Sequence, residues 1–214
     1  MNECLLIWGA GGHGKVVLDV ARSTGRFDRI AFLDDDSARA GLTPCDCPLI
    51  GGPGELPRLA GSAFVVAVGD NRTRARCFTR AIENGLSPTA LVHSTGVVAP
   101  SATIGCGTVV MPGAIVNAGA VIGENCIINS GAVVEHDCRI EAHVHISPRA
   151  VLGGGVSVGA FAHVGIGAIV LPRAVIGEDS VIGAGAVVLR DAPARRTVVG
   201  VPAKVRLLRP ATFQ

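Results

Sequence analysis

The chain has 214 residues, of which 49% are hydrophobic and only 3% aromatic, with 29 glycines and no tyrosine. This length allows two modest domains, and the formal net charge of +2 argues against the strongly basic surface of proteins that bind nucleic acid or anionic membranes. No charged-then-apolar leader opens the chain, and no apolar run reaches the length of a membrane span. We therefore expect a cytoplasmic protein without membrane insertion.

The seven cysteines do not follow the spacing of a disulfide framework. Cys126 and Cys138 occupy positions that small residues fill elsewhere in the chain, where a cysteine behaves as a small hydrophobe. Cys45 and Cys47 form a C-x-C without a second pair, which is a weak metal signal. A reducing compartment and the absence of a metal are therefore expected.

Residues 1–88 predict a small α/β domain that resembles half of a Rossmann fold. Short apolar strands are expected at 3–8, 29–33, 49–50 and 63–68, with a helix after the first strand and another after the last. This alternation indicates a parallel sheet. Because the domain is so small, we expect it to hold one nucleotide diphosphate and not to enclose NAD.

A glycine-rich turn joins the first strand to the first helix. Gly9, Gly11 and Gly14 match G-x-G-x-x-G, and acidic residues follow about 20 positions later at the end of the next strand, as in the dinucleotide fingerprint. The stretch also nearly matches a phosphate loop, but Val16 stands where that loop needs Ser or Thr to hold magnesium. The fingerprint is therefore the better interpretation.

The fingerprint predicts where a nucleotide would bind. Amides of Gly11 and Gly12 at the helix start would meet a phosphate, and Asp35 or Asp36 would hold the ribose or the base. A purely structural turn with solvated acids is the alternative. His13 inside the turn favours a binding site.

From residue 92 to residue 188, an aliphatic residue recurs at every sixth position. A small residue precedes it by two positions in most repeats. A hexapeptide period predicts a parallel β-helix, which we place in residues 89–214 together with a C-terminal tail. Three hexads make one triangular coil, so residues 18 apart are expected to lie above one another at a sheet spacing of about 4.8 Å. A β-sandwich would not keep this phase through 17 repeats.

His136 is expected at a corner of the β-helix. Its stacked neighbours would be Ala118 and Gly154, which are both small, so the imidazole would face open space. Glu135 and Asp137 flank it, and a carboxylate can orient one ring nitrogen and raise the basicity of the other. The alternative is a solvated corner histidine.

Two further histidines, His145 and His163, are 18 residues apart and are expected to stack on one face. Ladder residues without a catalytic role are one interpretation. A three-histidine metal site with His143 is disfavoured, because His143 and His145 fall at different phases of the repeat.

Three segments carry a resemblance to a known family: residues 9–15 (GAGGHGK), 129–138 (NSGAVVEHDC) and 199–204 (VGVPAK). They resemble the bacterial sugar O-/N-acyltransferase family, which joins a small nucleotide-binding domain to a left-handed β-helix. Its members include N-acetyltransferases of nucleotide-linked 4-amino-4,6-dideoxy sugars and sialic-acid O-acetyltransferases. The resemblance implies a homotrimer with active sites between adjacent β-helices, acetyl-CoA as co-substrate and a nucleotide-linked amino sugar on the N-terminal domain.

The resemblance also implies roles for single residues. His136 matches the catalytic base, and Asp137 stands where many members have Glu. Together with the glycine-rich turn, the expected substrate contacts are Gly11, Gly12, His13, Asp34, Asp35, Asn71, Asn129 and Glu135. The expected cofactor contacts are His145, Gly154, Gly165 and Ala184.

The sequence therefore predicts an acetyl-CoA-dependent N-acetyltransferase that acetylates the 4-amino group of a nucleotide-linked sugar. His136 would take the proton of the attacking amine, and the amide of Gly154 would stabilise the oxyanion. A covalent intermediate is not expected, because the phase of Cys138 points inward. Two alternatives stay open: O-acetylation of sialic acid or another sugar hydroxyl, and a non-enzymatic nucleotide-binding or scaffold trimer.

Overall fold

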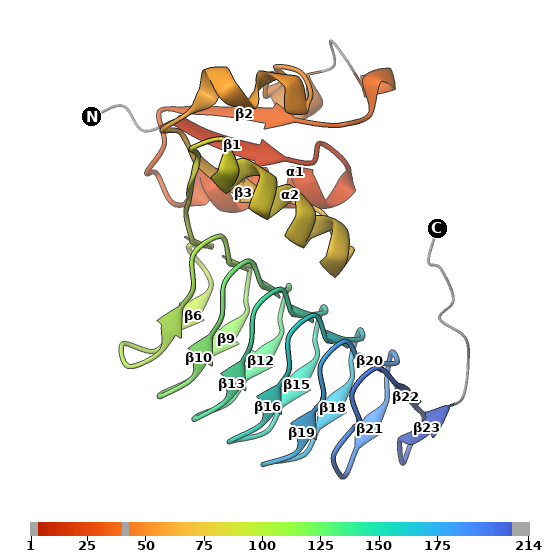
Figure 1. Ribbon diagram of the computed structural model, residues 1–214. Helices are drawn as coiled ribbons and strands as arrows, with labels where there is room; N and C mark the ends of the chain where they lie inside the picture. The colour runs from red at the N-terminus through yellow and green to blue at the C-terminus, as the bar shows by residue number, and fades with distance from the viewer. Residues whose placement is uncertain (1–3, 40–42, 207–214) are drawn as a thin grey trace.

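The computed structural model describes residues 4–39 and 43–206 of the chain. An α/β domain lies along one side of a long β-helix, and α2 runs between the sheet of the α/β domain and the stacked coils (Figure 1). The predicted fold class, an α/β domain followed by a left-handed parallel β-helix, is confirmed.

The N-terminal domain is built on a parallel four-stranded sheet with the order β2-β1-β3-β4. Its strands are β1 (Cys4–Trp8), β2 (Arg29–Leu33), β3 (Ala63–Val66) and β4 (Ser87–Pro88). The helices α1 (Gly12–Ser23) and α2 (Asn71–Glu83) cover opposite faces. Alternation along β1 explains this arrangement, since Ile7 packs with the apolar side of α1 and Trp8 packs with that of α2.

The strand expected at residues 49–50 is wrong. Leu49 makes only an isolated bridge to Phe32. One further backbone bond follows, from Asp34 N–H to the carbonyl oxygen of Gly51 at 3.0 Å, and Gly52 and Pro53 then end the pairing because a proline cannot donate to a ladder. The described part of this connection contains three short 3-10 helices: η1 (Ser37–Arg39), η2 (Pro44–Asp46) and η3 (Pro53–Leu59).

The β-helix contains 17 two-residue strands, β5 to β21, and each ends on one of the predicted six-residue aliphatic positions. Partners are 18 residues apart, as in Ile128 and Ile146, which confirms three hexads per coil. We name the three sheets by the side of the prism that they form. The junction sheet contains β5 (Leu91–Val92), β8 (Val109–Val110), β11 (Ile127–Ile128), β14 (His145–Ile146), β17 (His163–Val164), β20 (Val181–Ile182), β22 (Thr197–Val199) and β23 (Lys204–Arg206).

The two other sheets close the prism. The aliphatic sheet contains β6 (Val97–Val98), β9 (Ile115–Val116), β12 (Val133–Val134), β15 (Val151–Leu152), β18 (Ile169–Val170) and β21 (Val187–Val188). The mixed sheet contains β7 (Thr103–Ile104), β10 (Val121–Ile122), β13 (Arg139–Ile140), β16 (Ser157–Val158) and β19 (Val175–Ile176). The second residue of most strands is buried in one continuous core together with small residues such as Ala132 and Cys138.

The two domains share an apolar contact. Leu91, Val109 and Ile127 point outward from the junction sheet and belong to the same buried cluster as Val17 of α1. The sheet of the N-terminal domain ends with β4, and β5 begins at Leu91, so we place the domain boundary between these two strands.

Candidate active site

His136 lies at the corner that links the aliphatic sheet to the mixed sheet. Its Nδ1 is 2.9 Å from Oδ2 of Asp137, and its backbone N–H donates to Oε2 of Glu135 at 3.3 Å. Because a carboxylate only accepts, the first contact favours a proton on Nδ1 and a lone pair on Nε2. Asp137 has a left-handed backbone (φ 60°), which turns its carboxylate back to the neighbouring ring.

The imidazole of His136 rests against Gly154 one coil further along. A Cβ at Gly154 would lie 2.5 Å from Nε2, so only a glycine leaves the ring in this position. The side chain of His136 is nevertheless 62% exposed. The Nε2 atom thus lies against Gly154, the residue whose amide was predicted to stabilise an oxyanion.

A second polar group lies on the junction sheet. Nδ2 of Asn129 is 3.0 Å from Nε2 of His145, and Oγ of Ser147 is 2.9 Å from Nε2 of His163. The two imidazoles stack with a centroid separation of 4.8 Å, as their spacing in the sequence predicts. Asn129, His145 and their neighbours therefore form one hydrogen-bonded face beneath the N-terminal domain.

His13, in the first turn of α1, approaches the same face. Burial lowers the pKa of His13 to about 4, and the charge of Arg74 adds to this effect. Burial also lowers the pKa of His145 well below its usual value, with contributions from His163, Arg74 and His13. Both imidazoles are therefore neutral at neutral pH. Nε2 of His13 is buried without a hydrogen-bond partner among the described residues, which is typical of an atom that a ligand or a water satisfies. Nδ1 of His145 has no partner of good geometry there either, although the backbone of Gly69 is close enough to oppose the lowering of the pKa of His145.

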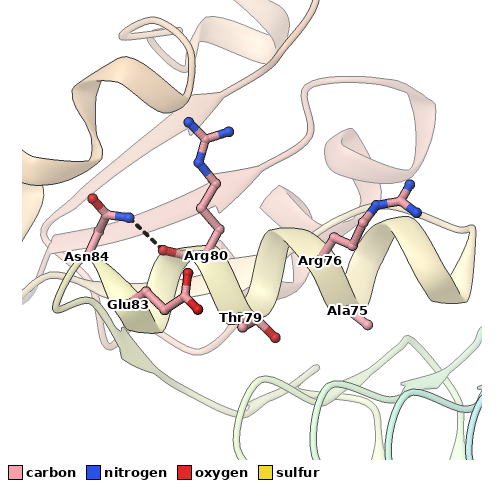
Figure 2. A pocket seen from close by; sticks show the side chains of 6 residues that line it. All are labelled: Ala75, Arg76, Thr79, Arg80, Glu83 and Asn84. Atoms are coloured by element: carbon pink, nitrogen blue, oxygen red, sulfur yellow. Dashed lines mark hydrogen bonds between the residues drawn. The ribbon is translucent and has the colours of Figure 1, made fainter.

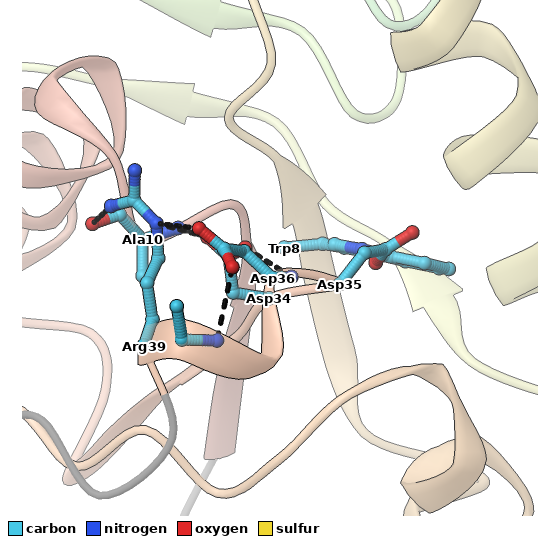
Figure 3. Close-up of polar contacts among 7 residues, drawn as sticks. Trp8, Ala10, Asp34, Asp35, Asp36 and Arg39 are labelled. Atoms are coloured by element: carbon cyan, nitrogen blue, oxygen red, sulfur yellow. Dashed lines mark hydrogen bonds and ion pairs between the residues drawn. The ribbon is translucent and has the colours of Figure 1, made fainter.

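The acidic residues after β2 divide into two kinds (Figure 3). Asp34 accepts from the backbone N–H of Ala10 at 2.7 Å and of Asp36 at 2.9 Å, so it holds the glycine-rich turn in place. Asp35 accepts from Nε1 of Trp8 at 2.6 Å, and its residue is exposed. Asp34 is thus engaged within the protein, whereas the carboxylate of Asp35 is open to a ligand.

The glycines of the turn also divide by what surrounds them. A Cβ at Gly14 would collide with the carbonyl oxygen of Gly9, and a Cβ at Gly9 would lie 2.7 Å from the carbonyl oxygen of Ala67, so both glycines serve the close packing of the turn. A Cβ at Gly11 would meet only Arg39 Nη1 at 3.9 Å, and at Gly12 it would meet nothing within 4 Å. Gly11 and Gly12 therefore lie where a phosphate could approach the backbone.

Two hollows flank α2. The larger, about 540 Å³, is lined by α2 and its C-cap Asn84 and contains no residue of the predicted site (Figure 2). The smaller, about 330 Å³, lies at the carboxyl ends of β1 and β2 and includes Asp35, Arg76 and Arg80. Ligands of parallel α/β sheets bind at this edge, so the smaller hollow is the better candidate for a nucleotide.

The remaining predicted cofactor contacts, Gly165 and Ala184, lie at the corner between the junction sheet and the aliphatic sheet. Asn129 is at the same corner. His136 and Gly154 lie at the opposite edge of the aliphatic sheet, on the vertex that faces away from the junction sheet. One chain therefore carries the two halves of the predicted site on different edges of the prism.

A thiol nucleophile beside His136 has no support. Cys138 is fully buried, and burial raises the pKa of its thiol. Over residues 4–39 and 43–206, no three His, Cys, Asp or Glu side chains are arranged to hold a metal ion. No helix in the same ranges is long and apolar enough to cross a membrane.

Two family models match the chain: the PglD N-terminal domain at residues 4–81, and the bacterial transferase hexapeptide (six repeats) at residues 101–136 and 119–154. A crystal structure of a perosamine N-acetyltransferase variant from Caulobacter crescentus, in complex with CoA and GDP-perosamine, is 42% identical, with a TM-score of 0.89 over 94% of this chain and 96% of that one. The chain belongs to the bacterial sugar acetyltransferases.

Two further structures extend the comparison of this acetyltransferase. The acetyltransferase domain of PglB from Neisseria gonorrhoeae, in complex with acetyl coenzyme A, is 40% identical, with a TM-score of 0.91 over 96% of this chain and all of that chain (100%). WeeI from Acinetobacter baumannii is 25% identical, with a TM-score of 0.87 over 96% of this chain and 100% of its own. The similarity thus spans both domains.

Sequence reasoning about the acetyltransferase missed Arg74, which is 1% exposed at the domain junction. The signal was an arginine inside the apolar stripe of α2, where Asn71, Cys77, Phe78 and Ala81 are the other buried positions. Both polar atoms of the Asn71 side chain bond within the protein, to Phe161 and Ala162 carbonyls and to Arg74. The side chain of Asn71 is therefore engaged at the domain junction.

Proposed function

We propose that this acetyltransferase moves the acetyl group of acetyl-CoA to the 4-amino group of a nucleotide-linked 4-amino-4,6-dideoxy sugar. The observation that carries the proposal is the His136–Asp137 pair, which presents a free Nε2 beside the Gly154 amide. The relatives that bind CoA, and the one that binds GDP-perosamine as well, support the choice of both substrates. We also propose a role in polysaccharide biosynthesis in the cytoplasm, which the free cysteines support.

The reaction follows from these contacts. The sugar amine attacks the thioester carbonyl while Nε2 of His136 accepts the proton that the nitrogen loses. Asp137 holds the ring and stabilises the imidazolium that forms. The Gly154 amide donates to the oxyanion. When the tetrahedral intermediate collapses, the C–S bond breaks, the thiolate of coenzyme A leaves, and the proton on His136 can neutralise it.

A homotrimer is part of the proposal, because the aliphatic sheet offers a surface for a second copy. The outward position of every strand in this sheet is a β-branched aliphatic: Val97, Ile115, Val133, Val151, Ile169 and Val187. In the single chain Val97 is 58% exposed and Ile169 is 43% exposed. The outward positions of the mixed sheet instead vary in character: Thr103, Val121, Arg139, Ser157 and Val175. An apolar stripe of this kind marks a surface that another protein covers.

Three-fold packing on the aliphatic sheet would also complete the site. It brings the His136 edge of one copy next to the edge of the next copy that carries Asn129, Gly165 and Ala184. Head-to-tail contacts that close into a ring satisfy every copy in the same way. Acetyl-CoA would then lie in the groove between the two edges, close to His145, and the amino sugar would reach it from the N-terminal domain.

The test is a thiol-release assay with acetyl-CoA and a panel of UDP-, dTDP- and GDP-linked 4-amino sugars, with free sialic acid as the O-acetylation arm. We expect release with a nucleotide-linked amino sugar and a loss of about a hundred- to ten-thousand-fold in kcat for His136→Ala, the usual effect of removing a general base. Release only with sialic acid would favour O-acetylation. Release with neither class, or full activity in His136→Ala, would contradict the proposal.

A further inference from the structure

The first turn of α2 lies along a single stacked corner of the β-helix. The corner residues are 18 apart and occupy successive coils: Asn125, His143, Phe161 and Asp179. Arg74 donates to the carbonyl oxygens of Asn125 (Nε, 3.0 Å) and His143 (Nη2, 2.8 Å). In the next two coils, Asn71 donates to the carbonyl oxygen of Phe161 at 2.8 Å, and Arg72 contacts the Asp179 carboxylate at 2.7 Å. One helical turn thus holds four coils.

Arg74 is the centre of this contact. It also donates to the carbonyl oxygens of Val68 at 3.1 Å and Gly69 at 3.2 Å, and to Oδ1 of Asn71 at 2.7 Å. The planar guanidinium has five N–H donors in a fixed fork, which suits a ring of oxygens on several sides. A single buried side chain therefore ties the loop after β3 to two coils of the β-helix.

The anchored coils are the ones that carry the histidines of the site. His145 follows the anchored His143 by two residues, and His163 follows the anchored Phe161 by two. Arg74 also holds the loop after β3. Strand β3 belongs to the sheet whose carboxyl edge carries the smaller hollow, the candidate nucleotide site. Arg74 thus helps to set the positions of the hollow and of His145 relative to each other, together with the apolar contact between the domains.

We propose that Arg74 is a positioning residue, which fixes the N-terminal domain against the coils of His145 and His163 so that a bound sugar nucleotide is aligned with the acetyl group. This inference rests on the proposed function. Arg74 itself touches neither the predicted base His136 nor the hollow around Asp35, so its effect on the reaction is transmitted through the residues that it anchors.

The same side chain has an electrostatic effect that can be measured without catalysis. Burial is the largest cause of the lowered pKa of His13 and of His163, and the charge of Arg74 is the next cause for both. Removing the charge should therefore raise both pKa values, whereas a lysine that keeps the charge should not.

The experiment compares Arg74→Lys and Arg74→Met with Arg72→Met. Arg72 is the matched control, because it lies in the same turn and its pair with Asp179 is exposed (59% and 36%), where such pairs contribute little. In both Arg74 variants we expect kcat to fall by about a hundredfold, as when bound groups are misplaced by about 1 Å, while KM for each substrate changes little. Arg72→Met should keep the kcat of the unmodified protein.

Imidazole titration by NMR is the second readout. Arg74→Met should raise the titration midpoints of His13 and His163, and Arg74→Lys and Arg72→Met should leave them in place. If Arg74→Met does not fold, Arg74→Lys decides the kinetic question. A kcat within about twofold of the unmodified protein in a folded Arg74 variant, or a rise in KM alone, would overturn the positioning role. If the unmodified protein transfers no acetyl group, the proposed function fails. Unchanged titration midpoints of His13 and His163 in Arg74→Met would independently overturn the role of Arg74.

Discussion

The position of the His136 ring depends on the absence of a side chain at Gly154. A methyl group at this position would lie 2.5 Å from Nε2 and would push the imidazole away from the amide beside it. The geometry that the proposed base His136 needs therefore also depends on a residue that has no side-chain functional group. Motif matching identifies the histidine, but only the stacking of the coils explains the glycine.

Gly154→Ala should lower kcat by about a hundredfold, because it displaces the base while it retains the backbone N–H. The matched control is the double variant His136→Ala/Gly154→Ala. If the alanine acts by displacing the ring, the double variant should be no slower than His136→Ala alone. Additive losses would show that Gly154 acts in another way, and an unchanged kcat in Gly154→Ala would remove its role.

The glycine-rich turn allows a separate test of the nucleotide site. Gly12 has open space around it, so Gly12→Val should fold and should obstruct a phosphate that approaches the helix start. We expect a higher KM for the sugar nucleotide and an unchanged KM for acetyl-CoA in steady-state assays. A selective rise in the acetyl-CoA KM would mean that the two substrate sites are assigned the wrong way round.

At the scale of elements, the β-helix was predictable because its period is short and strict. Every strand from β5 to β21 lies where the repeat places it, since each coil buries the same kind of residue. A strand was predicted at residues 49–50, but only a bridge forms there. The difference depends on the glycines and the proline that follow. The stacking of His145 on His163 followed from the spacing of 18.

The junction between the domains could not be predicted from a periodic pattern. Arg74 and Asn71 are polar residues on the buried side of α2, and their partners are backbone carbonyls of coils that are distant in sequence. The same is true of the burial of His13 and His145, which only the docking of the two domains produces. Sequence reasoning singled out His13 through the glycine-rich turn and His145 through its spacing of 18 from His163, and the structure explains their neutral state.

The buried histidines predict how stability depends on pH. Burial lowers the pKa of His13 to about 4 and that of His145 and His163 below the usual value. Unfolded histidines take up protons near pH 6.5, so the unfolded state binds more protons as the pH falls. The contribution of these neutral histidines to the free energy of unfolding should therefore be complete above about pH 6.5 and decrease as the pH falls towards 4. His13 alone would account for at most about 3 kcal/mol of this loss.

Urea unfolding at constant protein concentration, measured between about pH 7.5 and 4.5, tests this dependence. His13→Gln should flatten the curve. His93→Gln is the matched control, because the His93 ring contacts Thr95 in an exposed turn and does not belong to the buried face of His13, His145 and His163. A free energy of unfolding that stays constant, or that rises as the pH falls through this range, would contradict the neutral buried histidines.

At the scale of the whole molecule, the two halves of the site lie on different edges of one prism. His136 is at the vertex opposite the junction sheet, and His145 is on that sheet beneath the N-terminal domain. In the proposed trimer the two halves meet because the aliphatic sheets of three copies pack around one axis. Sedimentation should therefore give a mass near three times 21.7 kDa.

The most direct test is complementation between two impaired variants, His136→Ala and His145→Ala, each tested alone and then as trimers assembled from an equal mixture. In a ring whose sites each take His136 from one copy and His145 from the next, about one quarter of the sites in a random mixture contain both histidines. We predict that the mixed trimers recover about this fraction of the acetyl-transfer activity of the unmodified protein. If the mixed trimers are no more active than the separate variants, each active site takes both histidines from one chain, and the shared site is contradicted.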